Sequence, residues 1–518
     1  MREIIIGSRG SDLALWQANF VQGQLNALGY ASQIKIIVTK GDRIQHLSFD
    51  KIEGKGFFTK EIEDALLANE IDLAVHSLKD LPTASPDGLM IGATSYREDP
   101  RDLLLIRPSS YDASAPLGLK PGAMVGTSSA RRKVQVKLLQ NDVELKDLRG
   151  NVPTRIQKCR DGHYDAILLA AAGVTRLKLP LEDFKAIYLQ ADKFVPAPAQ
   201  GVLGLQIRDN DAWMKTVIVK LHRADVAASV AVERKTLHLF EGGCHMPVGA
   251  YCVQKEHAFE LTVVKASDDS QLPVKIRLTS ANTENLAEEA VMLANKARTG
   301  RIFISRELHQ CGLLAAQLEA HGYEVICESL ITTRAQPFKD VPKADWLFFV
   351  SRNAVEYFLS CYKPSPDTKL AAVGEGTAQA IAAQGYKAAF VGEGHNLALI
   401  AEAFATVAQG SKVVFPIGSR SKRSIQLGIQ HACEVEELVV YINEPKPVVV
   451  NGQLNAVVLS SPSSAEAFLQ VNQVHSETLF VAMGRTTAER LRQLGIKRMV
   501  ESFGFRQDEL AMTIFSHL

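Results

Sequence analysis

The 518-residue sequence has no long apolar run, and no stretch approaches the roughly 20 apolar residues that a membrane-spanning helix needs. It also has no excess of charge, because 58 Lys and Arg residues stand against 57 Asp and Glu residues. A net charge of +1 gives no global field that would draw the protein to nucleic acid or to a membrane surface. Any role in anion binding must therefore come from local clusters of basic side chains.

Cysteine is scarce, and the seven cysteines are scattered without a CxxC pair. This excludes the usual signature of a zinc ribbon or a redox motif, so we expect no metal site. A sparse, odd set of thiols is typical of a reducing compartment, and we expect a cytoplasmic protein. The phosphate-binding pattern GxxxxGK[ST] is also missing, which makes carboxylate the favoured anion over phosphate.

The remaining composition is that of a globular protein, with 46% hydrophobic and 22% charged residues. A chain of this length predicts three or four domains. At the N-terminus strands and helices alternate, with strands expected at Ile4–Ile6, Ile34–Val38 and Ile71–His76 and helices at Leu13–Leu28 and Thr59–Asn69. Such alternation predicts α/β layers around a largely parallel sheet, with ligands near the carboxyl ends of its strands.

The next segments change in character. Arginines crowd the stretch from Arg97 to Arg176, which still contains a clear strand at Ala166–Ala170 and so predicts a second α/β unit. A helix after Trp213, strand alternation over Tyr251–Val264 and a helix over Ala287–Ala297 predict a small α+β unit. No Gly/Ser-rich or Pro-rich linker precedes the following strand, so we expect the two halves to be held close.

The C-terminal part contains an internal repeat at an offset of 110 positions. Trp346–Phe358 lies over Ala456–Phe468, and Gly374 and Thr377 lie over Gly484 and Thr487. Each copy reads as a strand, a turn rich in Ser or Gly, and a helix. The repeat predicts two similar α/β domains whose facing loops form a cleft.

Three features carry possible chemistry. Arg131 and Arg132 follow a Gly/Ser turn at a predicted helix start, and several further arginines lie near other turns. A single arginine is best explained as a solvated basic side chain, but this clustering indicates a ligand with many acidic groups. Asp80 follows a predicted strand, where it can serve catalysis or simply cap a turn. Cys244 follows two glycines, so its thiol can be an accessible nucleophile, although a free cysteine is more often a small core residue.

Taken together, the motifs of residues 1 to about 298 closely resemble hydroxymethylbilane synthase, also called porphobilinogen deaminase. The segments that carry the resemblance occur in family order and are Ser8–Gln17, Lys40–Asp42, Gly54–Phe57, His76–Asp80, Arg97–Asp102, Gly126–Arg132, Leu148–Val152, Pro198–Gly201 and Glu241–Cys244. The resemblance implies a three-domain enzyme that joins four porphobilinogen units head to tail and releases ammonia.

The resemblance also implies the roles of particular residues. It implies a dipyrromethane cofactor held covalently by Cys244, Asp80 as the catalytic carboxylate that also contacts the cofactor, and Lys79 as a second catalytic residue. The further contacts that it implies are Lys55, Ser129, Arg131 and Arg132 for the cofactor, and Arg9, Ser11, Arg149, Arg155, Arg176 and Gln200 for the substrate. Each pyrrole carries two carboxylates, and loss of ammonia creates an electron-poor cation that a nearby carboxylate can stabilise.

Residues from about 301 to the end resemble uroporphyrinogen-III synthase more loosely. The signals are Phe348–Glu356, Val373–Thr377, Ser460–Pro462 and Met483–Thr487. This resemblance implies a cyclase that acts on hydroxymethylbilane and inverts its last ring. It implies Tyr441 as the acid that removes the hydroxyl group, and carboxylate binding near Ser351, Ser461, Thr486 and Thr487. Tyr441 can equally be a packed aromatic residue of a strand.

The expected architecture follows from both resemblances. We expect α/β folds throughout: two doubly wound deaminase domains, 1–95 with 192–213 and 96–191, and a small α+β domain, 214–298, that carries the cofactor cysteine. Two similar synthase domains, 301–333 with 444–518 and 334–443, would enclose a cleft. The expected partners are the small molecules porphobilinogen and hydroxymethylbilane, without nucleic acid or membrane, and we expect a monomer.

Two alternatives belong to other classes. The first half could be a binding module, because two-domain α/β clefts also serve solute-binding proteins, although a binding module needs neither a tethered cofactor nor a catalytic acid. The second alternative keeps the deaminase activity and makes the C-terminal half a non-catalytic interaction domain.

Overall fold

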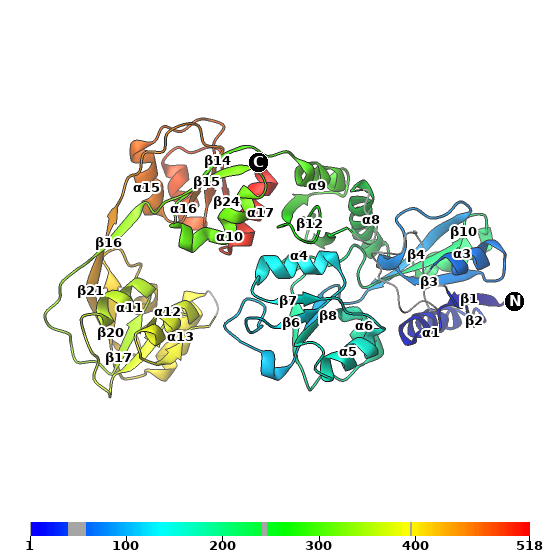
Figure 1. The fold of residues 1–518 in the computed structure, drawn as a ribbon, viewed down its shortest axis with the longest axis horizontal. Coiled ribbons are helices and arrows are strands. Elements are labelled where there is room, and N and C mark those ends of the chain that lie inside the picture. The colour runs from blue at the N-terminus through cyan, green and yellow to red at the C-terminus, as the bar shows by residue number, and fades with distance from the viewer. Residues whose placement is uncertain (1, 40–58, 241–245, 394–395) are drawn as a thin grey trace. The chain divides into compact units, whose positions relative to one another are not determined.

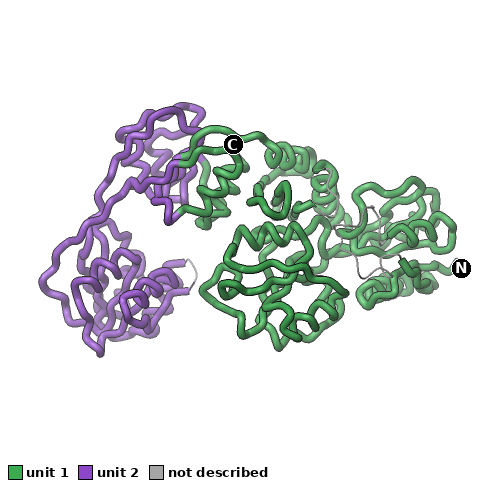
Figure 2. The backbone as a smooth tube through the Cα atoms, in the orientation of Figure 1, with its two compact units in different colours: residues 1–302, 311–325, 500–518 green, residues 303–310, 326–499 purple. Residues whose placement is uncertain are grey.

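The protein is described by a computed structural model that places residues 2–39, 59–240, 246–393 and 396–518. Within these ranges the chain is a mixed α/β protein with strands in five sheets (Figure 1). None of the helices placed there is long and apolar enough to span a membrane. The chain divides into two compact units, residues 1–302 with 311–325 and 500–518, and residues 303–310 with 326–499 (Figure 2).

The first sheet has the strand order β2-β1-β3-β10-β4. Its elements are β1 (Ile4–Ser8), α1 (Asp12–Ala27), β2 (Ser32–Ile36), α3 (Lys60–Leu67), β3 (Leu73–Ser77), the 3-10 turn η2 (Leu78–Asp80), β4 (Leu89–Arg97), β10 (Val202–Arg208), α7 (Ala212–Ile218) and the 3-10 turn η4 (Val219–Leu221). β1 is parallel to β2 and β3, as predicted, but β10 is antiparallel to β3 and β4. The chain returns to this sheet at the carboxyl end of β3, where Leu203 pairs with Ser77, so β10 can only run in the opposite direction.

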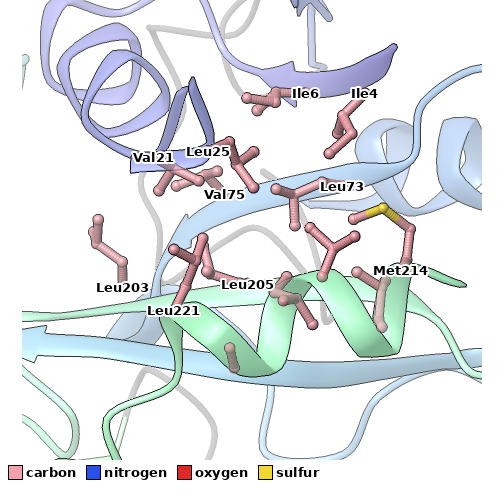
Figure 3. Packing of buried hydrophobic residues seen from close by; sticks show 14 of the residues in the cluster. Ile4, Ile6, Val21, Leu25, Leu73, Val75, Leu203, Leu205, Met214 and Leu221 are labelled. Atoms are coloured by element: carbon pink, nitrogen blue, oxygen red, sulfur yellow. The ribbon is translucent and has the colours of Figure 1, made fainter. Parts of the chain in front are cut away.

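The core of this sheet shows why the N-terminal pattern folds as it does (Figure 3). Ile4 and Ile6 alternate along β1 and so point to the same face of the sheet. Val21 and Leu25 are four residues apart on α1 and meet them there, and Met214 of α7 belongs to the same cluster. All five side chains are fully buried.

The second sheet has the order β7-β6-β8-β5-β9. Its elements are β5 (Asp102–Ile106), the 3-10 turn η3 (Pro108–Ser110), β6 (Met124–Gly126), α4 (Ala130–Leu139), β7 (Glu144–Lys146), α5 (Val152–Arg160), β8 (Ala166–Ala170), α6 (Ala171–Leu177) and β9 (Lys185–Leu189). The predicted strand Ala166–Ala170 is confirmed at both ends. β8 lies between a parallel neighbour, β6, and an antiparallel one, β5.

The third sheet is an antiparallel meander of three strands. Its elements are α8 (Ala224–Leu239), β11 (Val248–Lys255), β12 (Ala258–Lys265), β13 (Val274–Ser280) and α9 (Leu286–Asn295). The alternation over Tyr251–Val264 is therefore a hairpin and not one strand. Its turn contains Glu256 at a φ of 50° and His257, a pair without the Gly, Asn or Pro that normally marks a turn in a sequence.

Two further sheets contain the internal repeat. The first, in the order β15-β14-β22-β23-β24, comprises β14 (Gly300–Ile304), α10 (Leu308–Glu319), β15 (Tyr323–Cys327), β22 (Ala456–Leu459), α15 (Pro462–Val471), β23 (Leu479–Ala482), α16 (Arg485–Gln493), β24 (Met499–Glu501) and α17 (Gln507–His517). The second, in the order β16-β21-β20-β17-β18-β19, comprises β16 (Ile331–Ala335), β17 (Trp346–Phe349), α11 (Arg352–Leu359), β18 (Lys369–Ala372), α12 (Glu375–Ala383), β19 (Ala388–Val391), α13 (Leu397–Val407), β20 (Lys412–Gly418), α14 (Ser424–Ile429) and β21 (Glu434–Pro445).

The repeat at an offset of 110 appears in both the elements and their details. β17 and β22 begin at equivalent positions, as do β18 and β23, and the strand order β21-β20-β17-β18-β19 matches β15-β14-β22-β23-β24. Ser351 and Ser461 are the equivalent N-caps of α11 and α15. Both have a φ of −157°, and the hydroxyl of each accepts a hydrogen bond from the N–H three residues later.

Candidate functional site

The candidate site of the N-terminal part lies where the first, second and third sheets are joined. Glu233 of α8 is fully buried and accepts hydrogen bonds from Arg97 Nη1 at 2.7 Å, Cys252 N at 2.8 Å and Ala199 N at 2.7 Å. These contacts tie β4, β11 and the segment before β10 to one carboxylate. Gly201 in that segment has a φ of 91°, and an added Cβ would lie 2.3 Å from the Glu98 carbonyl oxygen, so the joint admits no larger residue there.

Two of the predicted anion-binding arginines are held by one buried acid. Asp102, the first residue of β5, is fully buried and accepts from Arg131 Nη1 at 2.7 Å and from Arg132 Nη2 at 2.7 Å. Burial alone would raise the pKa of Asp102, but the two guanidinium groups hold it well below its usual range. One carboxylate for two arginines leaves a net positive charge, and it fixes the orientation of both guanidinium groups at the start of α4.

A side-chain relay connects this acid to the predicted catalytic segment. Gln200 is fully buried, and its Nε2 donates to Asp102 Oδ1 at 3.1 Å and to Pro100 O at 2.8 Å. Its Oε1 accepts from Lys79 Nζ at 3.3 Å. The structure therefore brings together three predicted residue groups, Lys79, Gln200 and the pair Arg131 and Arg132.

The charges around Asp80 form a positive cluster. Asp80 ends the turn η2 and is exposed, and its charge favours the protonated forms of Lys79 and Arg155. Burial lowers the pKa of Lys79 to about 8, and Arg132 and Arg131 lower it further. Burial, with Arg132 and Arg149 nearby, lowers the pKa of Arg155 to about 10. Bound carboxylates would favour the protonated forms of Lys79 and Arg155 and so raise both pKa values again.

Other predicted residues lie around this cluster in different settings. Ser11 caps α1, where its hydroxyl accepts from Ala14 N at 3.4 Å, and Ser129 is the N-cap residue of α4. Arg9 lies close enough to His76 to help lower the pKa of that buried imidazole to about 4, after burial itself. Arg176 is buried, donates from Nη2 to Gly201 O at 2.7 Å and lies 5.6 Å above the Trp16 ring.

Lys55 and Cys244 lie outside the described residues. Two other cysteines of the same part can be compared with the expected nucleophile. Burial raises the pKa of Cys159 and of Cys252 to about 12, so both thiols stay protonated at neutral pH and are poor nucleophiles.

In the C-terminal part Tyr441 lies on β21 with its ring stacked on Tyr357, 5.4 Å between ring centroids. Its hydroxyl oxygen is 3.2 Å from Ser351 Oγ at the start of α11. Gly418 ends β20 beside it, and an added Cβ would lie 2.5 Å from Tyr441 Cζ, so only glycine leaves the ring in place. The structure thus joins Tyr441 and Ser351 at a helix N-terminus.

The remaining predicted residues of this part lie at the starts of α15 and α16. Ser461 caps α15, Thr487 is buried, and the exposed Thr486 accepts from Lys422 Nζ at 3.2 Å. Arg420 Nη1 donates to Ser463 Oγ at 3.1 Å in the first turn of α15. The basic loop after β20 therefore contacts the starts of both helices, and each cation meets a neutral hydroxyl.

Sequence reasoning missed several of these residues. Asp102 and Arg97 stand in a motif that supported the resemblance, yet nothing in the sequence shows that one acid pairs with two arginines or that Arg97 meets Glu233, 136 positions away. Arg420 and Lys422 belong to the run Ser419–Arg423, which contains three basic residues directly after a strand. That pattern was a usable signal for an anion site.

Comparison with protein families and curated sequences gives matches to both parts. Residues 4–216 match the family described as "Porphobilinogen deaminase, dipyromethane cofactor binding domain", and residues 313–511 match "Uroporphyrinogen-III synthase HemD". The chain is 40% identical over 298 residues to a porphobilinogen deaminase of Geobacillus kaustophilus, covering 57% of this chain and 95% of that protein. It is 42% identical over 293 residues to one of Bacillus cereus, covering 56% and 93%.

Among solved structures, a uroporphyrinogen-III synthetase of Helicobacter pylori matches 42% of this chain and 98% of its own. The sequence identity is 18% and the TM-score is 0.32.

Proposed function

The chain belongs to the porphobilinogen deaminase family and carries a uroporphyrinogen-III synthase domain behind the deaminase part, and we propose that it performs two consecutive steps of tetrapyrrole synthesis. The first part joins four porphobilinogen units to hydroxymethylbilane and releases ammonia. The second part closes this product to uroporphyrinogen III. The cation cluster around Asp80 is the observation that carries the first assignment.

The positive cluster is suited to the carboxylates of the substrate and of the growing chain. Every added pyrrole brings two carboxylates, and the cations Lys79 and Arg155 both lie near Asp80. Asp102 holds Arg131 and Arg132 in fixed orientations, so little reorganisation is needed when an anion binds. We assign the carboxylates to this cluster.

Asp80 has a different role, because it is the exposed acid among these cations. When porphobilinogen loses ammonia, positive charge develops on the pyrrole, and the Asp80 carboxylate stabilises that charge. Lys79 lies beside it, held by Gln200 and with a pKa of about 8, and is placed to orient the substrate and to exchange protons near neutral pH.

The donor set also fits the dipyrromethane that the matched family domain is named for. Two linked pyrroles carry four carboxylates, which the neighbouring cations Lys79, Arg132 and Arg155 can hold. When bound, this group supplies the pyrrole end to which substrate units are added. As the resemblance implies, Cys244, which follows two glycines, would hold it by a thioether. The buried thiols of Cys159 and Cys252 stay protonated and are poor nucleophiles.

For the second part, we assign Tyr441 as the acid that assists loss of the hydroxyl group of hydroxymethylbilane. Ser351 Oγ orients its phenol, and the ring is fixed between Tyr357 and Gly418. Among the residues that the structure describes, Arg420 and Lys422 have only neutral hydroxyl groups as side-chain hydrogen-bond partners, so they can exchange these for carboxylates of the substrate.

The cofactor assignment can be tested by intact mass. Cys244→Ala should give a folded protein that lacks the added mass of a dipyrromethane and makes no bilane. The exposed Cys361 is the matched control, and Cys361→Ala should keep both the added mass and the activity. Normal loading of the Cys244→Ala variant would contradict the assignment.

A further inference from the structure

The last helix, α17, is buried on more than one side. Leu510, Ala511, Met512, Ile514 and Phe515 are at most 1% exposed. A surface helix normally buries one stripe, so burial this complete requires neighbours on several faces. The segment 500–518 belongs to the same compact unit as residues 1–302, and Figure 2 draws it in the colour of that unit.

One of these neighbours is the third sheet of the deaminase part. Ser516 Oγ accepts a hydrogen bond from Arg277 N at 3.0 Å, which satisfies a backbone donor on the free edge of β13. The Arg277 guanidinium lies 5.3 Å above the Phe503 ring. The Phe515 ring lies beneath the Arg298 guanidinium at 4.8 Å. Both contacts have the geometry of a cation–π interaction.

The same contact region contains two buried side chains of opposite charge. Lys275 of β13 is 2% exposed, and its Nζ donates to Lys193 O at 3.0 Å. Burial lowers the pKa of Lys275 to about 8, and Asp508 in the first turn of α17 is the main group that opposes this. Asp508 is 3% exposed, with Oδ1 bonded to Arg506 Nε at 2.9 Å. Buried charges are tolerated only against specific partners, so this contact region is selective.

A second contact involves the loop between β12 and β13, residues 266–273. Gln317 Nε2 of α10 donates to Pro273 O at 2.7 Å, and His321 Nε2 lies 3.0 Å from Leu272 O. On its other side the loop is held by α4, where Lys137 Nζ donates to the Asp269 carbonyl oxygen at 2.8 Å. The loop thus links α10 to α4, whose first turn contains Arg131 and Arg132.

We propose that β13, α9 and the loop 266–273 form a docking surface whose occupant is the chain's own α10 and α17, and that the deaminase part is fully stable only when this surface is occupied. The range 313–511 that matches the synthase family includes residues 313–319 of α10 and 507–511 of α17. The two related deaminases are matched over 95% and 93% of their length by 298 and 293 residues of this chain.

The test uses the full chain with Phe515→Ala, which removes a fully buried ring between Arg298 and His321. Hydrogen exchange followed by mass spectrometry should show faster exchange in peptides covering 274–280, a readout that does not depend on either activity. The temperature of half-inactivation of the deaminase should fall by roughly 5 °C or more.

Phe404→Ala is the matched control, because Phe404 is equally buried in the core of the sheet that contains β17 and β20. It should leave both readouts of the deaminase part unchanged. Ser516→Ala is a small change that removes the acceptor for Arg277 N and the hydroxyl that donates to Met512 O. It should change exchange and half-inactivation in the same direction as Phe515→Ala, but by less. If the cavity left by Phe515→Ala prevents folding, Ser516→Ala still tests the proposal.

The outcome is decided by comparing the variants. Faster exchange in 274–280 for the α17 variants alone supports the proposal. If neither α17 variant changes exchange or half-inactivation of the deaminase, or if Phe404→Ala changes them equally, the docking surface does not stabilise the deaminase part and the proposal is overturned.

Discussion

At the scale of single residues, the chemistry assigned to the N-terminal part rests on one acid among several cations. Asp80 is exposed at the end of η2, while Asp102 is buried and already saturated by Arg131, Arg132 and Gln200. The Asp102 carboxylate therefore fixes the two arginines, and Asp80 is the acid of this pair that remains available to a substrate.

Asp80→Asn should keep the dipyrromethane but lose turnover by on the order of a hundredfold or more, because an amide cannot stabilise developing positive charge as a carboxylate does. Intact mass and single-turnover kinetics with porphobilinogen check the two statements separately. A variant with near-normal turnover would reduce Asp80 to a structural turn residue.

We expect Lys79 to make the reaction depend on pH. Because burial lowers its pKa to about 8, the ammonium group loses its proton as the pH rises through 8. We expect kcat/KM for porphobilinogen to fall above this pH, and Lys79→Arg to extend the plateau to higher pH, since a guanidinium stays charged. Lys120→Arg, at an exposed lysine, should leave the profile unchanged. Identical pH profiles of kcat/KM for the unaltered chain, Lys79→Arg and Lys120→Arg would contradict this role.

The sequence predicted the residue types of this site but not their pairing. Asp80 and Lys79 follow a recognisable strand and motif, and their roles remain predictions that rest on the resemblance. The two arginines were predicted to bind anions, and the structure adds that a buried carboxylate already holds them. That pairing depends on packing between β5 and α4, which no local pattern encodes.

At the scale of elements, periodic segments were predicted well and turns were not. The strand Ala166–Ala170 is a continuous apolar run and was found with its exact bounds. The second strand was expected at Ile34–Val38 but spans Ser32–Ile36, because its residues alternate between polar and apolar and the ends are ambiguous. The hairpin at Glu256 was missed because its turn contains no typical turn residue.

The basic loop after β20 yields a prediction at the same scale. Arg420→Ala combined with Lys422→Ala should raise the KM for hydroxymethylbilane roughly tenfold or more, because two charge-assisted contacts to carboxylates are lost. Steady-state formation of uroporphyrinogen III at varied bilane concentration measures this.

Lys497→Ala, at another exposed lysine of the same unit, is the control and should have no effect. An unchanged KM in the double variant would leave Arg420 and Lys422 as solvated side chains that happen to contact Ser463 and Thr486.

At the scale of the whole molecule, the isomer ratio of the final product reports on both activities. Hydroxymethylbilane that is released without a cyclase closes spontaneously to the symmetric type I isomer. The full chain fed with porphobilinogen should therefore give mainly the type III isomer. Tyr441→Phe should slow cyclisation without abolishing it, because orientation of the bound substrate also contributes to the rate, and should raise the share of type I.

Chromatographic separation of the oxidised isomers gives the ratio directly. Only type I product from the unaltered chain would show that the C-terminal part is not a working synthase. Gly418→Ala is a useful companion, since the added methyl group would displace the Tyr441 ring and should shift the ratio in the same direction.

The separation of α9 and α17 along the chain has a consequence for biosynthesis. β13 and α9 leave the ribosome more than 200 residues before the helix that covers them, since α9 ends at Asn295 and α17 begins at Gln507. At about 5–20 residues per second, this face stays bare for on the order of 10–40 s. The nascent deaminase part therefore waits for the synthesis of α17 to complete its surface, and during that interval we expect it to be a client for chaperones.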